Sequence, residues 1–281
     1  MKPSLLYLIL FLTTSFICHA IIIENDGLET VLNYLQTPDT LIAFDIDNTL
    51  ARTEHELGSD QWFCYLVDQK IAQGYDYLSA ISAVLPLCYY AQFNVPLIPT
   101  ESNIPLLLNK LHELNIFTMG LTSRSLPLAE RTHEQLLNIN INFYMPAIKT
   151  EELILPLLHQ CIYKYEIIFT SDNDKGEALL KFLDMINYRP QCIIFVDDKM
   201  RHIQSVEKAA ISRNIEYIGI RYSGCDELIN NFDPIKADMQ LQALQERNRS
   251  SIEHQTACTS YNKSPLWYYP FFIAMKLFTC F

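Results

Sequence analysis

Four short polar runs in the sequence contain the side chains that phosphoryl chemistry uses, and each follows an apolar segment. The runs are DIDNTL from Asp45, TSR from Thr122, TSDNDK from Thr170 to Lys175 and DDK from Asp197. The preceding segments, such as LIAF at 41–44, lack polar alternation, which is typical of strands covered on both faces. Because ligands of open parallel sheets bind at the carboxyl ends of strands, we expect the four runs to meet at one crevice.

This combination of groups predicts a metal-assisted attack on phosphorus. Crowded carboxylates repel one another and need a counter-ion. Hard oxygen ligands with no His or Cys beside them favour Mg²⁺, which takes one or two carboxylates together with a substrate phosphate. A carboxylate beside Mg²⁺ and a lysine can attack phosphorus, and a second acid two residues on can protonate the leaving alcohol and then activate water. Thr122, Lys175 and the N–H groups of the next helix would hold the non-bridging oxygens.

The runs, in this order, resemble the four motifs of the haloacid dehalogenase (HAD) superfamily, phosphatase branch. The matching segments are DIDNTL, LTSR, DKGEALL and FVDD, separated by 77, 53 and 23 residues from Asp45 to Thr122, Lys175 and Asp198. These gaps suit a member with a helical cap after the first motif. The chain also resembles an uncharacterised subgroup of exported bacterial HAD-like proteins that carry LGS-x-x-W there, here from Leu57 to Trp62.

The resemblance implies a role for each matching residue. Asp45 would be the nucleophile and a Mg²⁺ ligand. Asp47 would be the general acid and base, with its backbone carbonyl also on the metal, and an acid at this position favours phosphomonoester hydrolysis. Thr122, Ser123 and Lys175 would bind the phosphoryl group of the substrate.

Several assignments stay open in the sequence. Either Asp197 or Asp198 could be the fourth-motif metal ligand; we favour Asp198, with Asp197 in support. Lys199 is a rival to the third-motif lysine, although the DKGE context favours the latter. Arg124 could form a salt bridge near the site. Asp172 and Asp174 could be neighbours of Mg²⁺, although helix capping is favoured. The histidines His55, His112, His133 and His202 show no ligand spacing and are expected on the surface or on a helix face.

The elements that must position these residues predict an α/β fold, a parallel sheet flanked by helices as in HAD-like Rossmannoid proteins. Five strands are expected, and helices fit between them; the strands are at 41–44, 116–121, 166–169, 192–196 and 217–220. A small helical cap is expected at about 57–95, after the first strand, with helices at 60–73 and 77–91. The other expected helices are at 25–36, 104–114, 126–137, 175–186, 200–213 and 234–247.

The two ends of the chain read differently from its middle. Residues 1–20 have the layout of a secretory signal peptide, with an uncleaved membrane anchor as the alternative. Residues 21–255 are assigned to the core, and residues 256–281 to a linker with an apolar tail. The tail could contact a membrane, bind a partner or pack on the domain. The expected localisation is therefore export, periplasmic or secreted.

Composition excludes some functions and leaves two classes open. A net charge of −11 without a basic run argues against a nucleic-acid clamp. With only 7 glycines in 281 residues, a Gly-rich phosphate loop is not expected. Cys161 and Cys192 lie in apolar runs and are expected to be buried. The leading expectation is a Mg²⁺-dependent phosphatase acting on a small phosphomonoester; the alternatives are a phosphotransferase of the same superfamily and a non-enzymatic exported binding protein.

Overall fold

The computed structural model describes residues 19–35, 37, 39–146, 148 and 152–261. The described residues up to Ala237 form one compact unit, and those from Asp238 form a second. Most of the expected signal peptide and the expected apolar tail lie outside the described residues. Among the described residues, no helix combines the length and the apolar character that a membrane span requires.

The first unit is built on an eight-stranded, mostly parallel sheet with the order β1-β10-β9-β2-β5-β8-β7-β6. The strands are β1 (Ala20–Asn25), β2 (Thr40–Phe44), β5 (Phe117–Thr122), β6 (Glu152–Leu155), β7 (Cys161–Lys164), β8 (Ile167–Phe169), β9 (Cys192–Asp197) and β10 (Glu216–Tyr222). In this spatial order, neighbouring strands from β1 as far as β8 pair parallel. At the other edge, β7 pairs antiparallel with both β8 and β6. The expected α/β fold is therefore confirmed.

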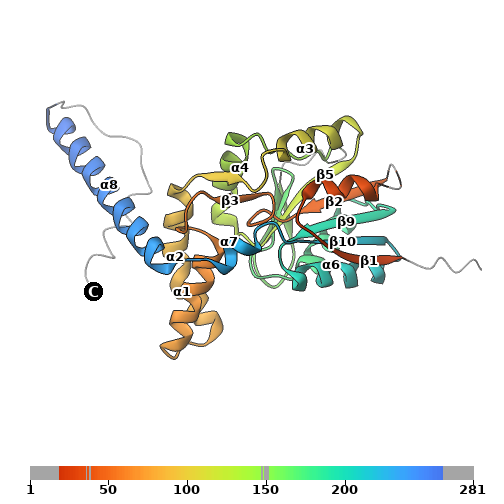
Figure 1. The fold of residues 1–281 in the computed structure, drawn as a ribbon, viewed down its shortest axis with the longest axis horizontal. Coiled ribbons are helices and arrows are strands. Elements are labelled where there is room, and N and C mark those ends of the chain that lie inside the picture. The colour runs from red at the N-terminus through yellow and green to blue at the C-terminus, as the bar shows by residue number, and fades with distance from the viewer. Residues whose placement is uncertain (1–18, 36, 38, 147, 149–151, 262–281) are drawn as a thin grey trace, which may run out of the picture. The chain divides into compact units, whose positions relative to one another are not determined.

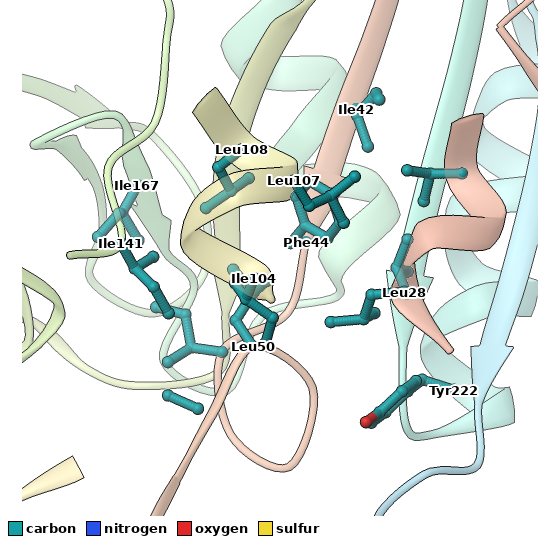
Figure 2. Close-up of a cluster of buried hydrophobic side chains, with 14 of the residues drawn as sticks. Leu28, Ile42, Phe44, Leu50, Ile104, Leu107, Leu108, Ile141, Ile167 and Tyr222 are labelled. Carbon is teal, nitrogen blue, oxygen red and sulfur yellow. The ribbon is translucent and has the colours of Figure 1, made fainter. Parts of the chain in front are cut away.

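Helices cover both faces of this sheet, so its strands are buried on both sides (Figure 1). The helices of the unit are η1 (Leu28–Tyr34), α3 (Ile104–Glu113), η2 (Leu126–Leu128), α4 (Ala129–Asn138), α5 (Lys175–Met185), α6 (Met200–Ser212) and α7 (Asp226–Asn230). In β2, Ile42 and Phe44 pack in one core with η1 and α3 (Figure 2), whereas Leu41 and Ala43 pack in the other with α5 and α6. This alternation explains why every residue of the strand is apolar or buried.

Four strands and the type of one helix differ from the sequence expectations. β1 was not expected because AIII continues the apolar leader, yet it pairs along its length with β10. The short antiparallel strands β6 and β7 carry no strong period-two pattern, and the sequence did not indicate them. β8 begins one residue later than expected, because Glu166 has a left-handed φ of 57°. The expected helix at 25–36 is the 3₁₀ segment η1.

The helical insertion between the first two expected strands is confirmed. It consists of α1 (Asp60–Ala72) and α2 (Tyr77–Asn94). The chain leaves the core through β3 (Ala51–Thr53), before α1, and returns through β4 (Leu97–Pro99), after α2. The two strands pair antiparallel. The insertion therefore stands on a two-stranded ribbon directly after the first motif, as Figure 1 shows.

The final helix, α8 (Pro234–Tyr261), is longer than the expected helix at 234–247. The polar residues from Asn248, expected to form a linker, continue this helix as far as Tyr261. Between Pro234 and Tyr261 the sequence has no Gly and no further Pro, so no residue strongly opposes the helix.

Gly58, at the entrance to the insertion, is a position that only glycine fits. Its φ is +79°, and a Cβ atom there would lie 2.9 Å from Val95 Cγ2 at the exit. Gly74, in the turn between α1 and α2, has a φ of +94° but nothing within 4 Å of the position of a Cβ atom. The two glycines therefore share a backbone constraint, and only the first has a steric one.

We predict that Gly58→Ala lowers the free energy of unfolding by about 2–4 kcal/mol, since strain and overpacking add. Gly74→Ala, with backbone strain alone, should cost about 1 kcal/mol. Urea unfolding of both variants measures the difference. Equal losses would contradict the close packing of entrance and exit.

Candidate functional site

Lys175 lies between two carboxylates at the carboxyl end of the sheet. Its Nζ atom is 2.6 Å from Asp45 Oδ1, after β2, and 2.7 Å from Asp197 Oδ2, at the end of β9. All three side chains are buried. The lysine is the first residue of α5, whose N-terminus is capped by Asp174, with Glu177 N–H donating to its carboxylate. The structure therefore brings the expected third-motif lysine to this end of the sheet, and Asp174 caps the helix as expected.

The close approach of α5 to α6 depends on the residue after this lysine. A Cβ atom at Gly176 would lie 2.4 Å from the carbonyl oxygen of Ser205 in α6. The Gly176 N–H donates to Ser205 Oγ, which in turn donates to Asp174. The glycine thus lets α5 begin close against α6.

Asp197 is fully satisfied by its neighbours, whereas Asp198 is not. Besides Lys175, Asp197 accepts the Lys199 N–H at 2.7 Å and lies 3.0 Å from His202 Nδ1. Burial would raise the pKa of Asp197, but Lys175 and His202 outweigh it and hold the pKa well below its usual range. Asp198 Oδ1 is buried without a hydrogen-bond partner. Burial, Asp45 and Asp197 raise the pKa of Asp198 to about 8.

The electrostatics of Asp45 reflect the same crowding. Burial raises the pKa of its carboxyl to about 7, although Lys175 opposes the rise. Oxygen atoms of Asp45, Asp197 and Asp198 all lie within 4.8 Å of one another. Lys175 thus pairs with two of these three buried carboxylates, and the third, Asp198, forms no ion pair among the described residues.

Asp47 faces a different partner, an arginine from the second motif. Arg124 Nε and Nη2 each lie 2.8 Å from one carboxylate oxygen of Asp47, a bidentate pair. Burial would raise the pKa of Asp47, but Arg124 outweighs it and lowers the pKa. The salt bridge that the sequence left open for Arg124 is therefore present, and it holds Asp47 ionised.

The second-motif hydroxyl residues differ in their surroundings. Thr122 is the buried last residue of β5, the strand that pairs with β2, so it lies at the same sheet edge as Asp45. Its Oγ1 accepts the Arg124 N–H at 3.1 Å. Ser123 is exposed. Both stay candidates for phosphate contacts.

Several residues of the site were missed or misplaced in the sequence. His202, expected on the surface or on a helix face without a role in the site, lies on α6 with its side chain 14% exposed and contacts Asp197. Its position in the first turn after the fourth motif is the signal that could have indicated this contact. Lys199 does not reach Asp45 but forms a 2.8 Å ion pair with Asp60 of α1. In addition, the side-chain amides of Asn48 and Gln61 face each other at 3.3–3.4 Å. The insertion thus contributes residues to the edge of the site.

The arrangement as a whole offers a buried carboxylate beside a lysine, a second carboxylate two residues on and an oxygen-rich place for a cation. Such a set can attack an electrophilic centre, neutralise developing negative charge and transfer protons.

Comparison with known proteins identifies relatives of this chain and a family model that matches it. The chain is 26% identical over 199 residues to a protein of Chlamydia muridarum, covering 71% of this chain and 75% of the relative. It is 25% identical over 224 residues to a protein of Chlamydia pneumoniae, covering 79% and 84%. Both relatives bear the name "Putative outer membrane protein". No solved structure matches the chain significantly. A family model described as "Protein of unknown function (DUF2608)" matches residues 24–256, so the chain belongs to this family.

Proposed function

We propose that the protein is a Mg²⁺-dependent phosphatase of the HAD type, which hydrolyses a small phosphomonoester through an aspartyl-phosphate on Asp45. The observation that carries this proposal is the position of Lys175 between Asp45 and Asp197, beside the unpartnered oxygen of Asp198. A buried lysine so placed can neutralise both the nucleophile and the phosphoryl oxygens that approach it.

The residues present fit a divalent cation. The ion pairs of the site join four carboxylates to three cations, and Asp198 adds a fifth carboxylate beside them, so two negative charges would be uncompensated when all five are ionised; the paired carboxylates are Asp45, Asp47, Asp60 and Asp197, and the cations are Arg124, Lys175 and Lys199. Asp198 Oδ1 is an acceptor without a donor, which a metal ion would satisfy. All candidate ligands are hard oxygen atoms, which suits Mg²⁺. Asp45 and Asp198 would hold the ion, with Asp197 fully occupied by its protein partners.

The proposed reaction has two halves. In the first, a carboxylate oxygen of Asp45 forms a bond to phosphorus while the bond from phosphorus to the alcohol oxygen breaks, and Asp47 gives that oxygen a proton. In the second, Asp47 takes a proton from a water molecule, whose oxygen attacks phosphorus and releases phosphate and Asp45. Lys175 neutralises charge on the phosphoryl oxygens throughout, and bound Mg²⁺ would supply further charge stabilisation.

Arg124 bears on these two halves differently. The ionised Asp47 that it holds is the form that takes a proton from water. In the first half the carboxyl must carry a proton, a form that the bidentate pair disfavours. The distance between Arg124 and Asp47 therefore has to change during the proposed cycle.

We also propose that the protein is exported. Its N-terminal residues 1–20 have the layout of a secretory leader. The relatives' printed names, which refer to an outer membrane, agree with transfer out of the cytoplasm.

The proposed function makes a prediction about the nucleophile. The purified protein should release phosphate from p-nitrophenyl phosphate when Mg²⁺ is present and should lose this activity in EDTA. Asp45→Asn should lower kcat at least roughly 1,000-fold, since the attacking oxygen is removed. Asp172→Asn, which changes an exposed aspartate at the same sheet edge, is the matched control and should retain the rate. Activity that survives in Asp45→Asn would rule out this nucleophile.

The raised pKa of Asp198 predicts how the stability of the protein depends on pH. Because its pKa is about 8 in the folded protein and 3.8 in the reference state, the folded protein binds this proton more tightly. Its contribution to stability is therefore lost as pH rises from about 4 towards 8. In EDTA, Asp198→Asn should be more stable than wild type at about pH 8, by a few kcal/mol, with a smaller difference at about pH 5.

Urea unfolding at both pH values measures this difference. Millimolar Mg²⁺ should stabilise the wild type and have little effect on Asp198→Asn, because a ligand that binds only the folded state stabilises it. An equal Mg²⁺ effect on both proteins would show that Asp198 does not hold the ion.

A further inference from the structure

A chain of hydrogen bonds runs from the exit of the helical insertion to the proposed acid and base. At the exit, the carbonyl oxygens of Gln92 and Val95 accept the Gln135 Nε2 group at 3.1 and 2.7 Å. The other end of the same amide, Gln135 Oε1, accepts Arg124 Nη1 at 3.2 Å. Arg124 then holds Asp47 with two bonds of 2.8 Å. Each member of the chain therefore has its position set by the one before it.

Burial makes this chain selective for one arrangement. Gln135 is 2% exposed and Arg124 is 6% exposed, so neither can replace a lost partner with bulk water. Thr132, also buried, accepts Arg124 Nη1 at 3.0 Å and limits the guanidinium further. With Nη1 used by Thr132 and Gln135, the opposite edge, Nε and Nη2, is presented to Asp47. A planar guanidinium anchored on one edge can approach a carboxylate from only one direction.

The exit of the insertion is a place where a displacement would be transmitted. Val95 directly follows the last residue of α2, and its N–H still donates to the carbonyl oxygen of Ala91. Its side chain lies against Gly58, where the chain enters the insertion. A shift of α2 therefore moves the Val95 carbonyl oxygen, which accepts the shorter of the two hydrogen bonds that hold Gln135.

We propose that Gln135 and Arg124 are positioning residues that couple the exit of the helical insertion to the carboxylate of Asp47, so that proton transfer by Asp47 depends on where the insertion lies. The inference rests on the proposed role of Asp47. When the insertion occupies its present place, Arg124 holds Asp47 in the pair. When α2 moves, Gln135 follows its two carbonyl partners and draws the guanidinium away from Asp47, which then takes a proton from solvent and gives it to the leaving oxygen. Entry of a substrate beneath the insertion would thereby be linked to the first half of the reaction.

The test uses two substrates of similar shape that differ in their need for a proton. p-Nitrophenolate leaves readily without one, whereas phenolate is a stronger base and gains more from an acid. Gln135→Leu removes both ends of the link. It should lower kcat on phenyl phosphate by roughly 10- to 100-fold and kcat on p-nitrophenyl phosphate by less than about threefold, with KM little changed. A merely structural defect would lower both rates together.

Two further variants locate the effect. Gln135→Glu keeps an acceptor for Arg124 but loses the N–H donors to the insertion, so it should show the same leaving-group dependence as Gln135→Leu. Arg124→Lys keeps the charge without the fork and should not restore the wild-type ratio of rates. Glu134→Gln, on the exposed face of the same helix, is the matched control and should behave as wild type. A wild-type ratio in Gln135→Glu would overturn the link to the insertion.

The outcomes separate this inference from the proposed function. If the wild type with Mg²⁺ releases no phosphate from either substrate, the proposed function is overturned and this inference with it. If Asp47→Asn lowers kcat/KM, which reports the first half alone, equally for both substrates, Asp47 is not the acid, and the inference is again overturned. If Asp47→Asn discriminates between the substrates and Gln135→Leu does not, only this inference is overturned.

A readout without activity tests the same coupling. Arg124 lies between Gln135 and Asp47, so changes at these two residues should not act independently on stability. The urea midpoint of the double variant, Gln135→Leu with Asp47→Asn, should be shifted by less than the sum of the two single shifts. Fully additive shifts would overturn the coupling.

Discussion

The buried ammonium of Lys175 makes the rest of the site possible, because it is the charge that lets Asp45 and Asp197 share a dry place at the end of the sheet. Taking one such ion out of water costs several kcal/mol, and three carboxylates without compensation would repel one another strongly. Burial tends to lower the pKa of the lysine, but the two carboxylates outweigh burial and raise it, so the charge is retained. The sheet order then follows a chemical need, since β2 and β9 are direct neighbours and α5 starts where both end.

This compensation is incomplete, and the remainder is what gives the site its chemical character. Asp198 has a buried oxygen with no donor, and its pKa is raised for the same reason. A protein of marginal stability keeps such a group only where something else satisfies it or where it serves a function. The crowded carboxylates and the unpartnered oxygen therefore support the proposal of a cation bound together with an anionic substrate.

The insertion is held to the core by polar contacts on the loops that carry the site. Asp60 pairs with Lys199 and Gln61 pairs with Asn48 near its entrance, and Gln135 holds the carbonyls at its exit. Hydrogen bonds depend more strongly on direction than apolar contacts do. A displacement of the insertion would therefore shift the side chains that these contacts hold. The entrance and exit also touch each other at Gly58 and Val95, which makes the two ends move together.

The sequence by itself determined the α/β class, the helical insertion and the four runs that meet at the sheet edge, because hydrophobic period and strand-end chemistry are local properties of the chain. It could not indicate β1, whose isoleucines directly follow the apolar leader and which pairs with β10 far along the chain, or the short edge strands β6 and β7, which lack a clear period-two pattern. Only the tertiary structure decided which charge faces which. It assigned Lys175 to Asp45, Lys199 to Asp60 and Arg124 to Asp47, and it brought His202 to Asp197. Those pairings depend on how α5 and α6 pack beside the sheet and on where α1 of the insertion lies, and no spacing in the sequence encodes a distance between helices.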